Sequence, residues 1–279
     1  MDTNARIRRL ARQVRTGRVG RSTGELRLGL DLGTANIVMS VVDEHGDPVA
    51  GDWRQSGVVR DGVVVDWLGA VRAVKDLRGA LESRLQCRFA AASVAVPPGI
   101  DRGTTRVFVN VVEAAGLELV EIVDEPVAAA RTLGVMDGAV IDIGHGTTGV
   151  SVLESGRVVV SEDEATGGHH MTLVVAGALN ISYDEAELLK RDPQEHDQIF
   201  GLIRPTLEKM ASIAARVLDG GNVASIHLVG GSSTYAGSAE LFEEVLGQAV
   251  SHPDEPLFVT PLGIPLPAQL PVEHVRILR

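Results

Sequence analysis

The sequence predicts a duplicated α/β fold in which two lobes enclose a ligand-binding cleft. Strand-like apolar stretches alternate with stretches of helical periodicity along the 279 residues. In addition, an acid that ends a strand and leads into a small-residue turn occurs twice, at Asp31-Leu32-Gly33-Thr34 and in the stretch 142–149. The two copies fall in different halves of the chain, which predicts one copy per lobe. Chance similarity between two short hairpins is the alternative.

The second copy has the chemistry of a phosphate-binding turn. Strands are expected on both sides of it, at 138–141 and from Val150 onward. Glycines let backbone N–H groups approach an anion closely, and threonines add hydroxyl donors. The carboxylate of Asp142 is suited to hold a hydrated divalent cation beside phosphates. A glycine-rich hairpin that binds nothing is the plain alternative.

Bulk composition excludes several classes of protein. Hydrophobic residues make up 44% of the chain but aromatic residues only 3%, so we expect a core of Val, Leu, Ile and Ala. No apolar run reaches about 18 residues, so we expect no membrane span. The single cysteine, Cys87, cannot form an internal disulfide and fits a reducing cytoplasmic environment. No Cys/His cluster has the spacing of a zinc site.

Positive charge is concentrated at the start of the chain. Residues 1–27 carry eight arginines against Asp2 and Glu25, whereas the whole chain has a net charge of −11. An acidic body argues against nucleic-acid binding. Segment 5–15 places Ile7, Leu10, Ala11 and Val14 on one face of a basic helix that is too short to be stable alone. We therefore expect residues 1–25 to be a flexible tail that orders only on a partner, or a plain disordered tail.

Lobe I is expected to span residues 26–136. Its predicted strands are 26–32, 37–42, 92–96 and 117–123, its strand–turn–strand unit is 58–66, and its helices are 67–86 and 105–115. A further helix is expected to start with Glu125 as its cap and Pro126 at its first position. Glu125 is then either simply a capping acid or a carboxylate that orients a water molecule.

Lobe II is expected to span residues 137–264, followed by a proline-rich tail at 265–279. Its predicted helices are 171–179, 184–190, 197–218 and 236–246, and Pro205 is expected to kink the third of these or to start a new helix. His169 and His170 are adjacent, so on a helix they point about 100° apart and do not form a metal-binding face. Strand 225–229 delivers Gly230-Gly231-Ser232-Ser233, which is either an anion- or ring-accommodating turn or a plain tight turn.

In order and spacing, these motifs resemble the actin / DnaK-type chaperone / sugar-kinase ATPase superfamily. The resemblance implies a duplicated actin-like, ribonuclease-H-like fold with reduced peripheral subdomains. Its motifs here are Asp31–Thr34 and Asp142–Thr148 for phosphate, Asp124–Ala130 for the first connecting helix, and Leu228–Ser233 together with Ala186–Lys190 for adenosine.

A closer resemblance is to the EutJ family of ethanolamine-utilisation loci. It is carried by Arg60–Asp66, Asp163–His170 and Phe258–Leu262, and it extends over residues 26–264. It implies a chaperone-like assembly factor for a bacterial microcompartment and its ethanolamine ammonia-lyase-type enzyme. The expected partners are therefore the shell or that core enzyme, with segment 5–15 as a docking peptide, and the expected location is the cytoplasm at the microcompartment.

The superfamily resemblance also implies a site for ATP and Mg²⁺. Asp31 and Asp142 would hold Mg²⁺ through water, and Glu125, with Asp142, would serve hydrolysis by positioning the attacking water. The residues expected to contact the nucleotide are Gly33, Thr34, Ala35, Gly144, His145, Gly146, Thr147, Thr148, Glu187, Lys190, Gly230, Gly231 and Ser232.

Several departures from the superfamily pattern leave catalysis open. His145 and Gly149 stand where a glycine and an acid are usual, no lysine lies near Gly33, and Pro265 and Pro267 interrupt the last helix. A weak ATPase and a nucleotide-binding scaffold without turnover are both compatible with this sequence. The alternatives are a scaffold that does not hydrolyse ATP or that self-associates, and an ATP-dependent reactivating factor for a cobalamin enzyme. Nothing resembles a sugar-binding lobe.

Overall fold

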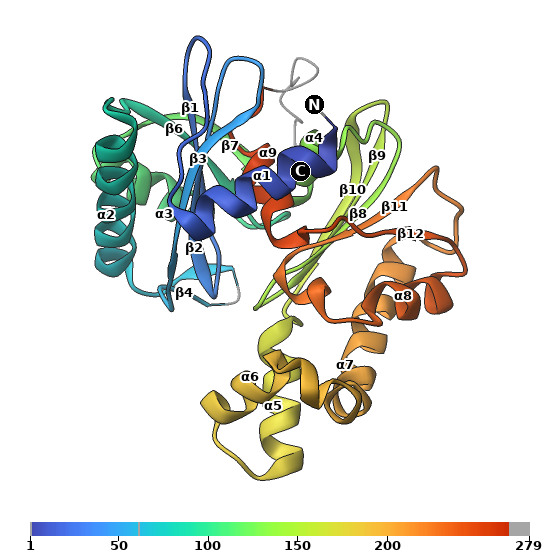
Figure 1. Cartoon of the computed structure of the whole chain (residues 1–279). Helices are drawn as coiled ribbons and strands as arrows, with labels where there is room; N and C mark the ends of the chain where they lie inside the picture. Colours follow the sequence, from blue (N-terminus) through green and yellow to red (C-terminus); the bar gives the residue numbers. More distant parts are fainter. Residues whose placement is uncertain (1, 61, 268–279) are drawn as a thin grey trace.

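The computed structural model describes residues 2–60 and 62–267 and consists of two lobes (Figure 1). Lobe I is built on a five-stranded sheet in the order β3-β2-β1-β6-β7. The first three strands form an antiparallel meander, and β6 and β7 add to it in parallel. The strands are β1 (Arg27–Leu32), β2 (Asn36–Val42), β3 (Pro48–Gln55), β6 (Ala91–Val96) and β7 (Glu118–Asp124).

Lobe II repeats this plan with its own five strands, in the order β10-β9-β8-β11-β12. Its first three strands are again an antiparallel meander, and the last two are again parallel. The strands are β8 (Gly138–Ile143), β9 (Thr148–Glu154), β10 (Arg157–Glu164), β11 (Ile226–Val229) and β12 (Val250–Ser251). The identical strand order confirms the predicted duplication.

Aliphatic residues form a separate core in each lobe. In lobe I, α2 (Trp67–Leu85) and α3 (Arg102–Ala114) pack on the sheet, and β4 (Val59–Arg60) and β5 (Val63–Val64) form a small hairpin near the lobe tip. In lobe II, α7 (His196–Val217) and α8 (Ser238–Leu246) cover the sheet. Pro205 lies inside α7, which continues through it, so the expected new helix start is absent at this point.

A small helical subdomain projects from the lower end of lobe II (Figure 1). It consists of α5 (Gly168–Leu179) and α6 (Tyr183–Arg191), followed by the 3₁₀ turn η1 (Pro193–Glu195). Among the described residues of lobe I, the corresponding addition is the β4–β5 hairpin. Both additions are short, which agrees with the expectation of reduced peripheral subdomains.

Two helices connect the lobes and cross each other. The first is α4 (Glu125–Leu133), and the second is α9 (Val259–Gly263), which follows the 3₁₀ turn η3 (Pro256–Phe258). The crossing is so close that a Cβ on Gly263 would lie 1.7 Å from the backbone oxygen of Ala128. Because no other side chain fits there, the hinge needs glycine at this position. α4 begins one residue earlier than expected, with Asp124 rather than Glu125 at the N-cap position.

The expectation of a flexible N-terminal tail is wrong. Residues Thr3–Thr16 form α1, which lies across the molecule beside β3 and α9 (Figure 1). The predicted apolar stripe is present, but Ile7, Leu10 and Ala11 are fully buried against this chain's own surface. The sequence shows an amphipathic face without showing what covers it, so the pattern alone does not distinguish a helix that docks on its own chain from one that awaits a partner.

The predicted C-terminal tail lies mostly outside the described residues, which end at Leu266 and Pro267. Within residues 2–60 and 62–267, no helix is both long enough and apolar enough to cross a bilayer.

Candidate functional site

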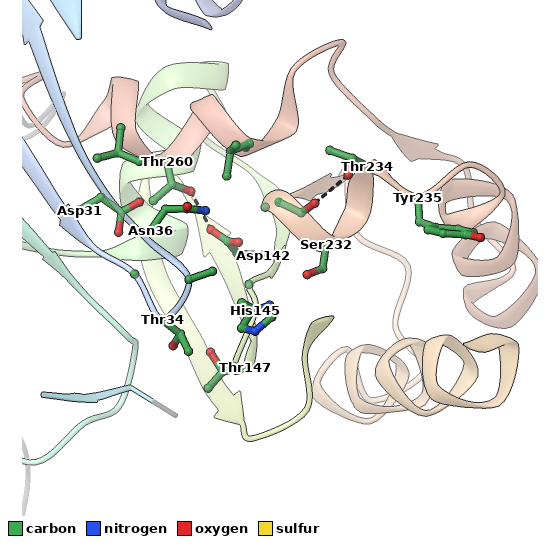
Figure 2. A pocket seen from close by; sticks show the side chains of 18 of the residues that line it. Asp31, Thr34, Asn36, Asp142, His145, Thr147, Ser232, Thr234, Tyr235 and Thr260 are labelled. Carbon is green, nitrogen blue, oxygen red and sulfur yellow. Dashed lines mark hydrogen bonds between the residues drawn. The ribbon is translucent and has the colours of Figure 1, made fainter. Parts of the chain in front are cut away.

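A cavity of about 670 Å³ lies between the lobes, within the size range of small-molecule sites. Of the predicted site residues, all but Thr148 line it. Both acid-bearing turns therefore reach one space, although 111 residues separate Asp31 from Asp142. Figure 2 shows Asp31 and Asn36 on one side of Asp142, and His145 and Thr147 below it.

Asp31 and Asp142 occupy equivalent positions in the two sheets, each near the end of the first strand of its lobe. Burial, followed by the charge of Asp142, raises the pKa of Asp31 to about 7. Burial also raises the pKa of Asp142, against a hydrogen bond of 2.7 Å that Thr260 Oγ1 donates to Asp142 Oδ2. The two carboxylates therefore face each other closely enough to disfavour full ionisation without a cation.

Glu125 and Asp163 extend this acidic group. Burial and then the charges of Asp31, Asp142 and Asp163 raise the pKa of Glu125 well above its ordinary value. Burial raises the pKa of Asp163 to about 6, while a hydrogen bond from the Thr147 side chain acts in the opposite direction. Asp163 lies on β10 directly opposite Gly149, and a Cβ on Gly149 would lie 3.4 Å from Asp163 Oδ1.

The residues present fit a hydrated Mg²⁺ ion. No Lys or Arg among the described residues forms an ion pair with Asp31, Glu125, Asp142 or Asp163, and one oxygen of Asp163 is buried without a hydrogen-bond partner. No group of three or more protein ligands stands ready to bind a metal directly within the described part of the chain. Mg²⁺ commonly keeps most of its waters and uses only one or two carboxylates beside phosphates, and this arrangement suits that mode.

The second acid-bearing turn is unstrained despite its histidine. Outside glycine, the positive φ angles of the described residues fall on Gln86, Ser155, Asn180 and Asp219, so the side chain of His145 does not violate the backbone geometry. The turn rests on the start of α5, because Gly168 N donates to Gly144 O at 3.0 Å and His169 N donates to His145 O at 2.7 Å. A Cβ on Gly167 would clash with this backbone at 2.6 Å, and one on Gly168 would lie 2.2 Å from Ser232 Oγ, which explains the Gly-Gly pair.

A hydrogen-bonded chain joins the same turn to the helical subdomain. His145 Nε2 lies 3.1 Å from the hydroxyl of Tyr183, and that hydroxyl lies 2.9 Å from His169 Nδ1. Burial, then the charge of Lys190, lowers the pKa of His145 to about 4, so the ring is neutral at physiological pH. A neutral ring held in this way can stand beside a phosphate without adding positive charge.

The predicted adenosine-side pair is already bonded within the protein. Lys190 Nζ forms an ion pair with Glu187 at 2.7 Å and donates to Gly168 O at 2.9 Å. These contacts place the helix α6 beside the start of α5, and burial lowers the pKa of Lys190. Both side chains line the cavity as expected. Their mutual pairing indicates that they shape its wall.

The Gly230-Gly231-Ser232 turn closes the cavity against Asp142. A Cβ on Gly230 would lie 2.2 Å from Asp142 Oδ1, and the φ angle of +91° also requires glycine. The turn continues as a 3₁₀ segment, η2 (Gly231–Thr234), and the following helix begins at Ser238 rather than at the expected Ala236. Gly230 N donates to Pro256 O at 3.1 Å, which ties the turn to η3.

Beyond this turn the cavity has an aromatic wall. Tyr235 and His196 stack with ring centroids 4.8 Å apart, and Phe200 lies behind them at 6.1 Å from Tyr235. Tyr235 and His196 line the cavity, and Figure 2 shows Tyr235 on the side away from Asp31. The cavity therefore has an acidic, turn-lined end and a flat aromatic end, which is the polarity of a nucleotide.

Thr148 is the one predicted site residue that lies elsewhere. Its side chain is fully buried, and its hydroxyl donates to Thr166 O at 2.6 Å. Thr148 is the first residue of β9, and successive strand residues point to opposite faces. The side chain of Thr148 is therefore directed at Thr166, just before the Gly167–Gly168 pair, and does not line the cavity.

Comparison with known proteins agrees with this geometry. The family model of the cell division protein FtsA matches residues 139–263, and that of the MreB/Mbl proteins matches residues 55–186. The ethanolamine utilization protein EutJ of Salmonella typhimurium is 44% identical over 240 residues, covering 86% of this chain and 84% of that protein. The chain belongs to the EutJ family.

Solved structures agree with this assignment. The crystal structure of EutJ from Carboxydothermus hydrogenoformans covers 94% of this chain and 97% of its own, with a TM-score of 0.87 and 42% identity. MreB5 of Spiroplasma citri, solved with AMPPNP, aligns over 86% of this chain with a TM-score of 0.70 and 19% identity, which shows the fold alone. The actin-like fold expected from the motifs is confirmed.

Several cavity residues of this EutJ-family chain were not predicted from the sequence. They join the site from separate elements: Arg15 from α1, Asn36 from β2, Tyr235 after η2, His196 from α7 and Thr260 from α9. Asn36 and Tyr235 had a local signal, because Asn36 follows Ala35 in the first acid-bearing hairpin and Tyr235 follows the Gly230 turn. Arg15, His196 and Thr260 depend on contacts between distant segments, so no local pattern reveals them.

Proposed function

We propose that this EutJ-family protein binds Mg²⁺-ATP between its lobes and acts as a chaperone-like assembly factor. The observation that carries the proposal is the convergence of Asp31 and Asp142, from two equivalent hairpins, on one cavity without a balancing Lys or Arg in the described residues. A cation held by phosphates would supply the missing positive charge. The AMPPNP bound by the MreB5 neighbour, which has the same fold, supports this choice of ligand.

Each part of the cavity has a role in this proposal. The backbone of the turns at Gly33 and Gly146 would hold the terminal phosphates, and Asp31 and Asp142 would hold the metal ion through water. When bound, Mg²⁺ would neutralise phosphate charge. Glu125 would position the attacking water. Tyr235 supports the base at the opposite end of the cavity.

The client and location rest on the family. EutJ relatives are named for ethanolamine utilization. We therefore propose the core enzyme, an ethanolamine ammonia-lyase-type protein, or the microcompartment shell as the partner, with action in the cytoplasm at that compartment. Docking of segment 5–15 to a shell would require α1 to leave its site on the body, because its apolar residues are buried there.

Nucleotide binding is tested first, and the action on the core enzyme second. Mg²⁺-ATP should raise the Tm of the purified chain, and ATP with excess EDTA should raise it much less, because binding only to the native state stabilises it. The core enzyme should then co-purify with the protein and increase ATP hydrolysis. A higher Tm with Mg²⁺-ATP, but no co-purification of the core enzyme and no faster hydrolysis in its presence, would support the nucleotide site. It would also show that this enzyme is not the client.

A nucleotide-binding scaffold with little turnover is the second candidate, and one observation favours it. The cavity-lining cations Lys190 and Arg191 are both paired with Glu187, and Arg15 is paired with Glu255. None of the described Lys or Arg side chains that line this cavity is therefore free to stabilise charge as it develops during phosphoryl transfer. Partner binding that is equal in ATP and ADP, with no measurable hydrolysis, would support the scaffold over the chaperone.

A further inference from the structure

Helix α1 contacts both lobes and contributes a residue to the wall of the cavity. On lobe I, Gln13 Nε2 donates to Pro48 O at 3.0 Å, and Arg6 pairs with Asp47 at 3.6 Å. On the lobe II side, Arg8 pairs with Asp254 and Arg15 pairs with Glu255. Figure 1 shows α1 running between β3 and the segment that leads into α9. It therefore forms a third link between the lobes, in addition to α4 and α9.

The contact with lobe I is built into the sheet. At Gly51 on β3, a Cβ would lie 2.5 Å from the side chain of Val14 and 2.9 Å from that of Leu10. Glycine at this position lets the apolar face of α1 approach the strand backbone. Because Leu10 is fully buried and Val14 is 6% exposed, this is a packed interface.

The contact with lobe II reaches the nucleotide turn through one short segment. Arg15 makes a bidentate ion pair with Glu255, with N–O distances of 2.5 and 2.6 Å, and its guanidinium lies 5.4 Å from the ring centre of Phe258. The intervening Pro256 accepts the hydrogen bond from Gly230 N. Two residues after Phe258, Thr260 donates to Asp142. Arg15 thus holds the segment that supports both the Gly230 turn and the Asp142 carboxylate.

We propose that Arg15 is a positioning residue of the nucleotide site and that α1 couples its own docking to nucleotide binding. The proposal rests on the proposed function for the identity of the ligand. If α1 fixes the lobes at the angle the nucleotide needs, docking of α1 favours binding. By linkage, binding must then favour docking of α1 to the same extent.

The test compares the full-length chain with Arg15→Gln, Arg12→Gln and Gly51→Ala. Arg12 is one turn earlier on the same helix and exposed, so its variant removes an equal charge without the Glu255 contact. We expect Arg15→Gln to weaken ADP binding about fivefold and Arg12→Gln to leave it unchanged. Gly51→Ala should also weaken binding, because it displaces α1 from lobe I without altering any charge. The double variant Arg15→Glu/Glu255→Arg should restore affinity, which a general loss of stability would not allow.

Hydrogen exchange supplies a second readout. ADP should slow exchange of the α1 amides in the wild type by a factor similar to the affinity loss in Arg15→Gln. Two results together would contradict the coupling: an ADP affinity of Arg15→Gln equal to that of the wild type, and hydrogen exchange of the α1 amides that ADP does not change. These results would not contradict the nucleotide site itself. If the wild type binds no nucleotide, the proposed function fails. Whether Arg15 holds segment 255–258 in place is then decided by hydrogen exchange of the amides in that segment. Arg15→Gln should speed it, and Arg12→Gln should not.

Discussion

Thr260 Oγ1 donates a hydrogen bond of 2.7 Å to Asp142 Oδ2 across 118 positions of sequence. Both side chains are buried, with 5% and 8% of their surface exposed. Thr260 belongs to the connecting helix α9, whereas Asp142 ends the first strand of lobe II. The hinge between the lobes is therefore bonded directly to a carboxylate that we assign to the metal site.

Thr260→Val should weaken Mg²⁺-ATP binding as well as the fold. The loss of a donor to a buried carboxylate costs about 1–3 kcal/mol of unfolding free energy. It also raises the pKa of Asp142 further, because this hydrogen bond acts to lower it. Thr132→Val is the matched control, since Thr132 Oγ1 donates to Val259 O at 2.8 Å in the same hinge without touching Asp142. Calorimetric titration of both variants should show weaker binding only for Thr260→Val, and equal affinities would contradict this role.

The two adjacent threonines of the second turn should differ in their effect on binding. Thr147→Val removes a hydroxyl from the cavity, so affinity for Mg²⁺-ATP should fall, and Tm should fall as well because the same hydroxyl bonds to Asp163. Thr148→Val removes the donor to Thr166 O from a buried site, so Tm should fall by several degrees while the folded protein keeps its affinity. Paired calorimetry and thermal unfolding measure both quantities. A loss of affinity in Thr148→Val but not in Thr147→Val would mean that Thr148, not Thr147, faces the ligand.

Gly263→Ala should be the most damaging small substitution in the hinge. Its methyl group would meet Ala128 O at 1.7 Å, so α4 and α9 must separate. We expect a loss of about 3 kcal/mol or more in unfolding free energy. Gly79→Ala is the control, because nothing lies within 4 Å of a Cβ there and α2 should gain about 0.5–1 kcal/mol. Urea unfolding of the two variants should therefore shift in opposite directions, and a tolerated Gly263→Ala would rule out the close crossing.

The stability of the ligand-free protein should depend on Asp31 in a defined pH window. Its pKa rises from an ordinary 3.8 to about 7 in the folded chain. Between these values the native state binds more protons than the unfolded state, so the unfolding free energy falls as the pH rises toward 7 and levels off above it. Asp31→Asn removes this penalty, and its Tm at pH 8 should exceed that of the wild type by about 2–4 °C or more.

Scanning calorimetry at pH 5 and pH 8 checks the Asp31 prediction. The gain from Asp31→Asn should be clear at pH 8 and smaller at pH 5, while Mg²⁺-dependent ATP binding is lost at both. A gain that is the same at the two pH values would show that the carboxylate is not held at high energy in the fold.

The fold was predictable because its signals are local and repeated. The acid-bearing hairpins at Asp31 and Asp142 and the Gly230 turn each stand within a short window. The assignment of Thr148 to the site was wrong because β9 begins at Thr148, two residues before the strand expected from Val150.

The remaining differences have a different origin. Thr260, Asp163 and Arg15 reach the site from other elements, through the hinge, the neighbouring strand and the N-terminal helix. A contact made between separate elements leaves no local periodicity to read, and the one between Thr260 and Asp142 spans 118 positions. The same reason explains α1: its amphipathic stripe was visible, but the surface that covers it, which both lobes and the connecting helices contribute, was not.

Calorimetric titration of ATP in the presence and absence of Mg²⁺ tests the central claim most directly. It should be run on the wild type, on Asp142→Asn, and on Asp137→Asn, which removes an exposed acid at the other end of the cavity-forming strand β8. We predict Mg²⁺-dependent binding in the wild type and in Asp137→Asn, and its loss in Asp142→Asn. Binding that is equal in all three proteins, or absent from the wild type, would contradict the two-hairpin Mg²⁺-ATP site.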